Sequence, residues 1–140
     1  MDTALLNRFI EAQEDTYSTA LKEIKEGCKN SHWMWYIFPQ LRGLGMTSIS
    51  RYYGILNLDE AKAYLEHPTL SGRLYEICNA LLQHKDKTAY EIFGDIDEMK
   101  LKSSMTLFAL TSKDYTIFDQ VLEQFFEGEM DEVTVKLINR

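Results

Sequence analysis

Cysteine and proline are scarce in this sequence, which has two of each among its 140 residues. Cys28 and Cys78 lie far apart, form no CxxC pair, and are too few to build a disulfide framework in a chain of this length. We therefore expect two reduced, buried thiols. Pro39 and Pro68 are expected at the boundaries of helices rather than inside them.

Long apolar runs and basic patches are also absent. No apolar stretch approaches the about 20 residues of a membrane span, and the first residues lack the basic start and apolar core of a signal peptide. The net charge of −7 means that the average surface repels phosphate backbones, and the lysines are interleaved with acidic residues. The sequence therefore predicts no nucleic-acid partner, no membrane partner and a cytoplasmic location.

Motifs that mark a metal site or a nucleophile are missing as well. The three histidines are scattered, and no HExxH, Cys–His cluster, GxSxG or P-loop pattern is present. We expect no bound metal and no cofactor. Whether the protein is an enzyme stays open.

The sequence does have an ordinary globular composition, with 45% hydrophobic and 26% charged residues. Apolar residues recur at steps of three and four along most of the chain, a pattern typical of amphipathic helices. No repeat, linker or low-complexity tract interrupts it. Residues 1–140 are thus predicted to form a single all-α domain of about seven or eight short helices in an irregular array.

Helix boundaries are predicted from the apolar spacing and the capping residues. The segment 3–26 should be helical, as one helix or two, with Asp2 and Asp15 as caps and Gly27 as its end. Within 32–38 a short helix capped by Ser31 is favoured over a buried strand. Further helices are expected over 48–53, 57–67, 68–82, 88–94, 95–108, 112–126 and 131–138. The last of these also has some strand preference.

The segment from His32 to Gln40 is the densest aromatic cluster of the chain. Its large side chains are expected first of all to build the core. His32 beside Trp33, at the start of a glycine-containing loop, could also supply an acid–base group and a stacking face for a flat ligand.

The loop that follows carries hydrogen-bond donors. Gln40 and Arg42 offer an amide and a guanidinium, and Gly43 and Gly45 would let backbone N–H groups approach an anion closely. A plain connecting loop is the simpler interpretation, because the P-loop lysine and its preceding strand are missing.

A third polar group is predicted on the helix after Asp95. Steps of three and four place Asp97, Lys100 and Ser104 on one face. Asp97 and Lys100 would form an ordinary surface ion pair there, or would bind a ligand if this face lines a cavity.

The string SHWMWYIFPQLRGLG at residues 31–45 resembles the signature of a bacterial family of small helical proteins of unknown function, some of whose members carry the label calpastatin. The likeness continues through 8–9, 60–61, 67–70, 92–94 and 103–108 and covers essentially the whole chain. The resemblance implies a multihelical fold in the bacterial cytosol, without an established activity. The label denotes a disordered protease inhibitor, which this aromatic-rich, periodic sequence does not resemble.

The sequence predicts a small-molecule-binding domain for a nucleotide-like or anionic ligand, with a pocket between the His32–Gly45 segment and the Asp97–Thr106 helix. Met46 and Thr47 stand where the family is expected to favour a basic and a small polar residue, which weakens the case for an anion site in the loop itself. The candidate site residues are His32, Trp33, Gln40, Arg42, Gly43, Gly45, Asp97, Lys100 and Ser104.

A catalytic version of this site would use His32 or Asp97 as base and Lys100 or Arg42 to stabilise an anion. The alternative function is a protein-interaction or self-associating module without catalysis, in which Trp33, Trp35 or the Tyr52–Tyr53 pair stays exposed. A buried Trp33 beside a polar-lined cleft would favour the ligand, and a flat exposed aromatic patch would favour the partner.

Overall fold

The computed structural model describes residues 3–139, and in this range the fold is all-α, as predicted. Its only β contact is an isolated parallel bridge between Leu41 and Ile55. No helix in this range is long and apolar enough to cross a membrane. The elements are η1 (Thr3–Leu6), α1 (Asn7–Glu26), α2 (Met34–Ile37), α3 (Ser48–Tyr53), α4 (Leu58–Glu66), α5 (Pro68–Leu82), α6 (Ala89–Thr111), α7 (Ile117–Phe126) and α8 (Glu132–Ile138).

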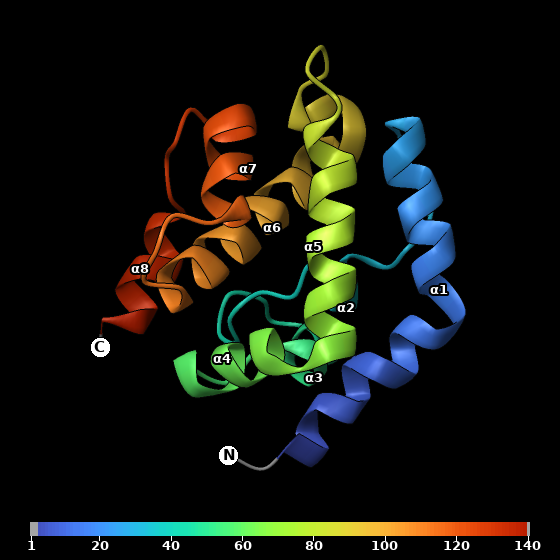
Figure 1. Ribbon diagram of the computed structural model, residues 1–140. Coiled ribbons are helices and arrows are strands. Elements are labelled where there is room, and N and C mark those ends of the chain that lie inside the picture. Colours follow the sequence, from blue (N-terminus) through green and yellow to red (C-terminus); the bar gives the residue numbers. More distant parts are fainter. Residues whose placement is uncertain (1–2, 140) are drawn as a thin grey trace.

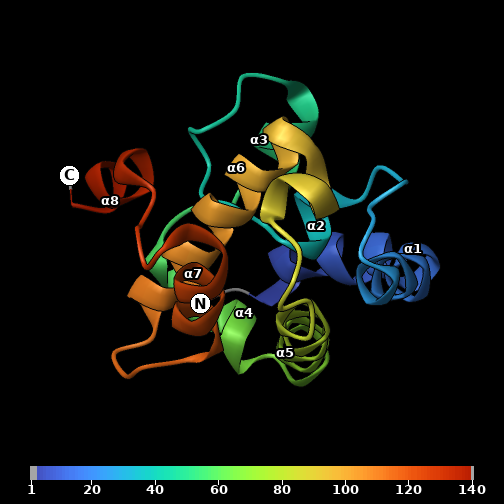
Figure 2. The same ribbon diagram turned by 90° about the horizontal axis from the view of Figure 1, so that it is seen from above.

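Helix α6 is the centre of the array. It packs against α4, α7 and α8, while α5 lies between α1 and α7 (Figures 1 and 2). From Leu101 to Ala109 almost every α6 side chain is buried, including the hydroxyls of Ser103, Ser104 and Thr106. A helix surrounded on most sides needs apolar or small side chains all round, which explains why this stretch has only one charged residue.

Several predicted helix ends are confirmed. Thr88 and Glu91 form a reciprocal capping box at the start of α6, and the side chains of Asn57 and Asp131 accept backbone N–H groups at the starts of α4 and α8. Gly27 ends α1 with a φ of 79°, a left-handed conformation that glycine adopts without strain.

Other predicted caps are wrong. Ser31 does not cap α2, which begins at Met34, because the Ser31 amide and hydroxyl both donate to the Glu23 carboxylate. Asp15 lies inside α1, which is one continuous helix, and Asp2 lies outside the described residues. Helix α7 begins at Ile117, later than expected, because Thr116 forms a capping box with Asp119.

One further prediction is confirmed and another needs correction. The break predicted at Gly94 is present, since its φ of 82° and ψ of 171° are non-helical, so α6 consists of two helical segments that meet at a kink. Cys78 is buried as expected, whereas Cys28 follows the end of α1 and is exposed. Both cysteines are free thiols.

Candidate functional site

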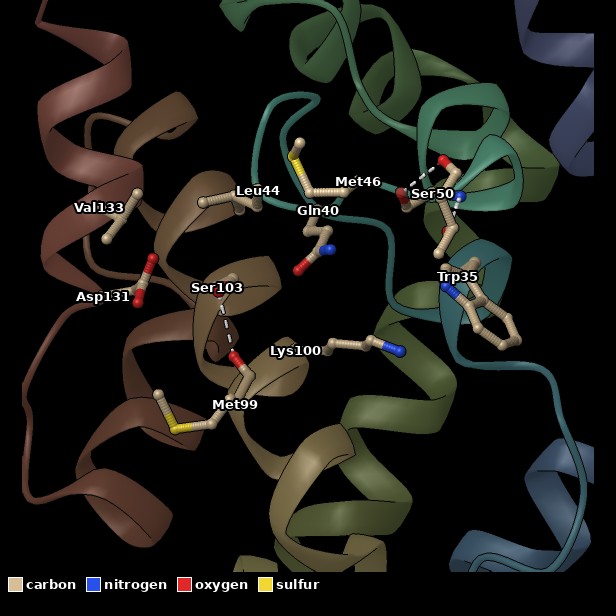
Figure 3. Close-up of a pocket in the computed structure, with 12 residues that line it drawn as sticks. Trp35, Gln40, Leu44, Met46, Ser50, Met99, Lys100, Ser103, Asp131 and Val133 are labelled. Atoms are coloured by element: carbon tan, nitrogen blue, oxygen red, sulfur yellow. Dashed lines mark hydrogen bonds between the residues drawn. The ribbon is translucent and has the colours of Figure 1, made fainter.

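A cavity of about 380 Å³ lies between the loop after Pro39 and the outer face of α6 (Figure 3). The start of α8 closes one side of it. The lining residues are Trp35, Gln40, Leu44, Gly45, Met46, Thr47, Ser50, Met99, Lys100, Ser103, Asp131 and Val133. Polar groups of both charges and hydroxyls therefore face apolar side chains across one concave surface.

The loop wall is fixed at its base by backbone hydrogen bonds. The Arg42 amide donates to the Ile55 carbonyl at 2.7 Å, and the Ile55 amide donates to the Gln40 carbonyl at 2.9 Å. A Cβ atom on Gly54 would lie 2.8 Å from the Arg42 Cα atom, so only glycine permits this close approach. Likewise, a Cβ atom on Gly45 would lie 2.6 Å from the Ser50 side chain.

The wall formed by α6 is lined by residues one, three and four positions apart, which share one face of the helix. Met99, Lys100 and Ser103 project from this face (Figure 3). The Ser103 hydroxyl donates to the Met99 carbonyl at 3.0 Å, so its oxygen is left to act as an acceptor.

Two lysines share one carboxylate beside the cavity. Lys29 Nζ lies 2.8 Å from Asp97 Oδ2, and Lys100 Nζ lies 3.5 Å from Asp97 Oδ1. Lys29 also donates to the Ser31 carbonyl, whereas Lys100 Nζ stands over the Trp35 ring, 4.4 Å from its centroid. The group of three therefore carries one net positive charge, and Lys100 is the member that lines the cavity.

Asp131 and Gln40 supply the other strongly polar groups. Asp131 Oδ2 accepts hydrogen bonds from the Thr134 amide and hydroxyl, while Oδ1 accepts none within residues 3–139. The Gln40 side chain projects into the cavity between Lys100 and Asp131 (Figure 3). The cavity can thus offer an ammonium, an amide and a carboxylate oxygen to one bound molecule.

Comparison with known proteins identifies the family of this chain. The family described as "Protein of unknown function (DUF1810)" matches residues 3–138. The chain belongs to this family. It is also similar to the conserved hypothetical protein Rv1873 from Mycobacterium tuberculosis, whose crystal structure matches with a TM-score of 0.96 at 42% identity over 99% of each chain. No curated protein matches the chain.

In this DUF1810 domain, three of the predicted site residues line the cavity: Gln40, Gly45 and Lys100. Asp97 lies next to them through its ion pair with Lys100. Trp33 does not line the cavity: it is buried, and its indole N–H donates to Glu23 at 3.0 Å.

The remaining candidates lie elsewhere. His32 is exposed, and the Arg42 guanidinium donates to the Arg51 carbonyl and lines a different cavity beside the end of α8. Gly43 is an exposed turn residue with a φ of 106°. Ser104 is buried, and within residues 3–139 its hydroxyl oxygen has no hydrogen-bond partner.

Sequence reasoning missed Trp35, Ser103 and Asp131 as lining residues. Ser103 follows Lys100 by three positions on α6, so helical spacing could have identified it. The sequence predicts a helix that begins at Asp131, but nothing in the local pattern indicates that this residue lines a cavity. Only the packing of α8 against α6 brings it there.

Glu23 was also missed, although it holds residues 30–33 in place. Its carboxylate accepts hydrogen bonds from the backbone N–H groups of Asn30 and Ser31, the Ser31 hydroxyl and the Trp33 indole, at 2.6–3.0 Å. Burial raises the pKa of the Glu23 carboxyl, but these hydrogen bonds outweigh that effect and hold the pKa below its ordinary value.

Proposed function

We propose that this DUF1810 domain binds a small anionic molecule in the cavity between the 40–50 loop and α6, with Lys100 as the main contact to the anion. The observation that carries the proposal is that the Lys100 ammonium is sheltered but incompletely paired. Its side chain is only 21% exposed, its carboxylate partner is shared with Lys29, and it makes no hydrogen bond within residues 3–139. A sheltered ammonium with unused donors favours an acceptor that brings negative charge.

The rest of the lining supports a small ligand. A volume of about 380 Å³ lies at the lower end of the range for small-molecule sites. Trp35 offers a ring face beside Lys100, and Met46 and Met99 are flexible apolar side chains at the rim. The proposal is limited to binding, because His32, the predicted base, lies outside the cavity, and Asp97 is already paired with two lysines.

A second candidate function is interaction with a partner or self-association, which exposed apolar side chains favour. Met46, Ile49 and Tyr52 are 83%, 40% and 55% exposed on the loop and on α3. Trp33, one of the anchors predicted for this alternative, is 1% exposed and cannot contact a partner. The burial of Trp33 near a polar-lined cavity is the arrangement that favours a ligand.

The test is a thermal-shift screen of the protein against a library of small anionic metabolites. We expect at least one compound to raise the melting temperature, and we expect Lys100→Gln and Gln40→Ala to abolish that rise. Lys102→Gln is the matched control, because Lys102 lies two positions further along α6, pairs with Glu129 and does not line the cavity. A stabilising compound whose effect survives in Lys100→Gln would contradict the proposed site.

A further inference from the structure

The charges that line the cavity are few and lie at opposite ends. Lys100 is the one cationic lining residue and Asp131 the one anionic lining residue in the described chain. Figure 3 shows the Lys100 side chain directed toward Trp35, while Asp131 lies across the cavity beside Val133, with Gln40 between the two. The cavity is therefore polarised, with a positive end at Trp35 and a negative end at the start of α8.

The Ser103 hydroxyl adds to the acceptor character of the Asp131 end. The proton of Ser103 is already donated to the Met99 carbonyl, so the Ser103 oxygen can only accept from a ligand. Asp131 Oδ1 is likewise a carboxylate acceptor, while Oδ2 takes the bonds from Thr134. A ligand that reaches this end needs a hydrogen-bond donor there.

The positive end can neutralise about one negative charge. Lys29, Asp97 and Lys100 together carry one net positive charge, and the guanidinium groups of Arg42 and Arg51 donate to backbone carbonyls and do not line the cavity. A di- or triphosphate would bring several negative charges toward a single ammonium and the Asp131 carboxylate, in a chain of net charge −7. This balance disfavours polyphosphate nucleotides.

We infer that the ligand carries one anionic group and a hydrogen-bond donor at its far end, and belongs to the amino-carboxylate or hydroxy-carboxylate class: its anionic group binds Lys100 beside Trp35 and its ammonium or hydroxyl group binds Asp131 and Ser103. This inference rests on the proposed function and specifies its ligand. Gln40 lies between the two ends and has both a donor and an acceptor for the middle of such a molecule.

The experiment uses simple probes that separate the two ends. Calorimetric or NMR titrations compare ω-aminocarboxylates from aminobutanoate to aminooctanoate with ω-hydroxyhexanoate, hexanoate, hexylamine and adenosine triphosphate. One chain length of the amino series should bind roughly fivefold to tenfold more tightly than the carboxylate that lacks the amino group. Hexylamine and adenosine triphosphate should bind more weakly than that aminocarboxylate.

Two conservative variants assign the ends. Asp131→Asn keeps an N-cap residue for α8 and removes the charge, so the preference for the aminocarboxylate over the plain carboxylate should disappear while binding of the plain carboxylate persists. Lys100→Gln should abolish binding of both.

The outcomes distinguish this inference from the proposed function. If hexanoate or adenosine triphosphate binds in a Lys100-dependent manner as tightly as every aminocarboxylate and hydroxycarboxylate, the polarised ligand is wrong and the anion site stands. If neither these probes nor the metabolite library binds in a Lys100-dependent manner, both proposals are overturned.

Discussion

Two regions have polar side chains next to a tryptophan: the Glu23 cluster, formed by Glu23, Asn30, Ser31 and Trp33, and the cavity wall at Lys100 and Trp35. They differ in how completely their polar groups are paired. The Glu23 carboxylate accepts four hydrogen bonds, one of them from Trp33. Lys100, beside Trp35, has one shared ion pair at 3.5 Å and unused donors. A polar residue whose bonds are all made inside the protein stabilises the fold, whereas one with unused capacity at a cavity is available to a ligand.

Arg8 and Glu60 are a second example of polar side chains that are paired inside the protein. Arg8 donates to Glu60 at 2.8 Å and to the carbonyls of Tyr52 and Gly54, and the Glu60 side chain is fully buried. The pair ties α1 to α4 and to the end of α3, and thus positions the loop that forms one cavity wall. Stability and binding should therefore respond to different residues.

The largest expected effect is on stability and comes from Arg8→Met. The substitution leaves the buried Glu60 carboxylate without its cation, so the free energy of unfolding should fall by about 3–5 kcal/mol in urea titrations. Lys22→Met, on the exposed face of α1, is the matched control and should change it by less than about 0.5 kcal/mol. Equal losses in the two variants would show that the Arg8–Glu60 pair has no special structural role.

Glu23→Gln should cost about 2–3 kcal/mol at neutral pH, because it weakens four charge-assisted hydrogen bonds, one of them from the buried Trp33 indole. The folded-state pKa of Glu23 lies below its ordinary value of 4.5, so the ionised carboxylate contributes its stability fully above that value and loses it as the pH falls through the lowered pKa. The difference between wild type and variant should therefore shrink in strongly acidic solution. Exposed Glu26→Gln is the control, and a difference that stays constant with pH would contradict this role.

Ser104→Ala should leave stability unchanged or raise it by about 1 kcal/mol, since the Ser104 hydroxyl is buried without a partner in the described chain. Ser103→Ala removes a hydroxyl that bonds to the Met99 carbonyl and gives the comparison. A clear loss of stability in Ser104→Ala, measured by thermal unfolding, would show that this hydroxyl has a partner.

The smallest stability effect is expected at the cavity itself. Lys100→Gln and Gln40→Ala should change the free energy of unfolding by no more than about 0.5 kcal/mol, because both side chains are partly exposed and contribute little to folding. The same proteins should lose the ligand-induced thermal shift. A large loss of stability in either variant would show that the residue stabilises the fold, as Glu23 does, and would argue against its role as a ligand contact.

Most of the fold was predictable because helices depend on local features. The apolar steps along α5, the Thr88–Glu91 box and the Gly27 end are all encoded within a few residues. The predicted start of α2 was wrong because Ser31, a good cap by type, instead bonds to Glu23 in the last turn of α1. Local preference was overridden by a tertiary contact that no spacing rule shows.

The candidate site was predictable only in part, for the same reason. The sequence located Lys100 and Gln40 because they are polar groups inside apolar stretches. It could not show that Arg42 turns toward the Arg51 carbonyl, that His32 faces solvent, or that α8 brings Asp131 to the cavity. Those directions are set by contacts between separate elements of the fold.

The central claim, that a small anion binds at Lys100 beside Trp35, is tested most directly by the two tryptophan indole N–H resonances in NMR spectra. Titration with the stabilising compound should shift the Trp35 resonance progressively and leave that of Trp33, which is buried and bonded to Glu23, nearly unchanged. In Lys100→Gln neither resonance should move. A ligand that stabilises the protein while the Trp35 resonance stays fixed would contradict the account.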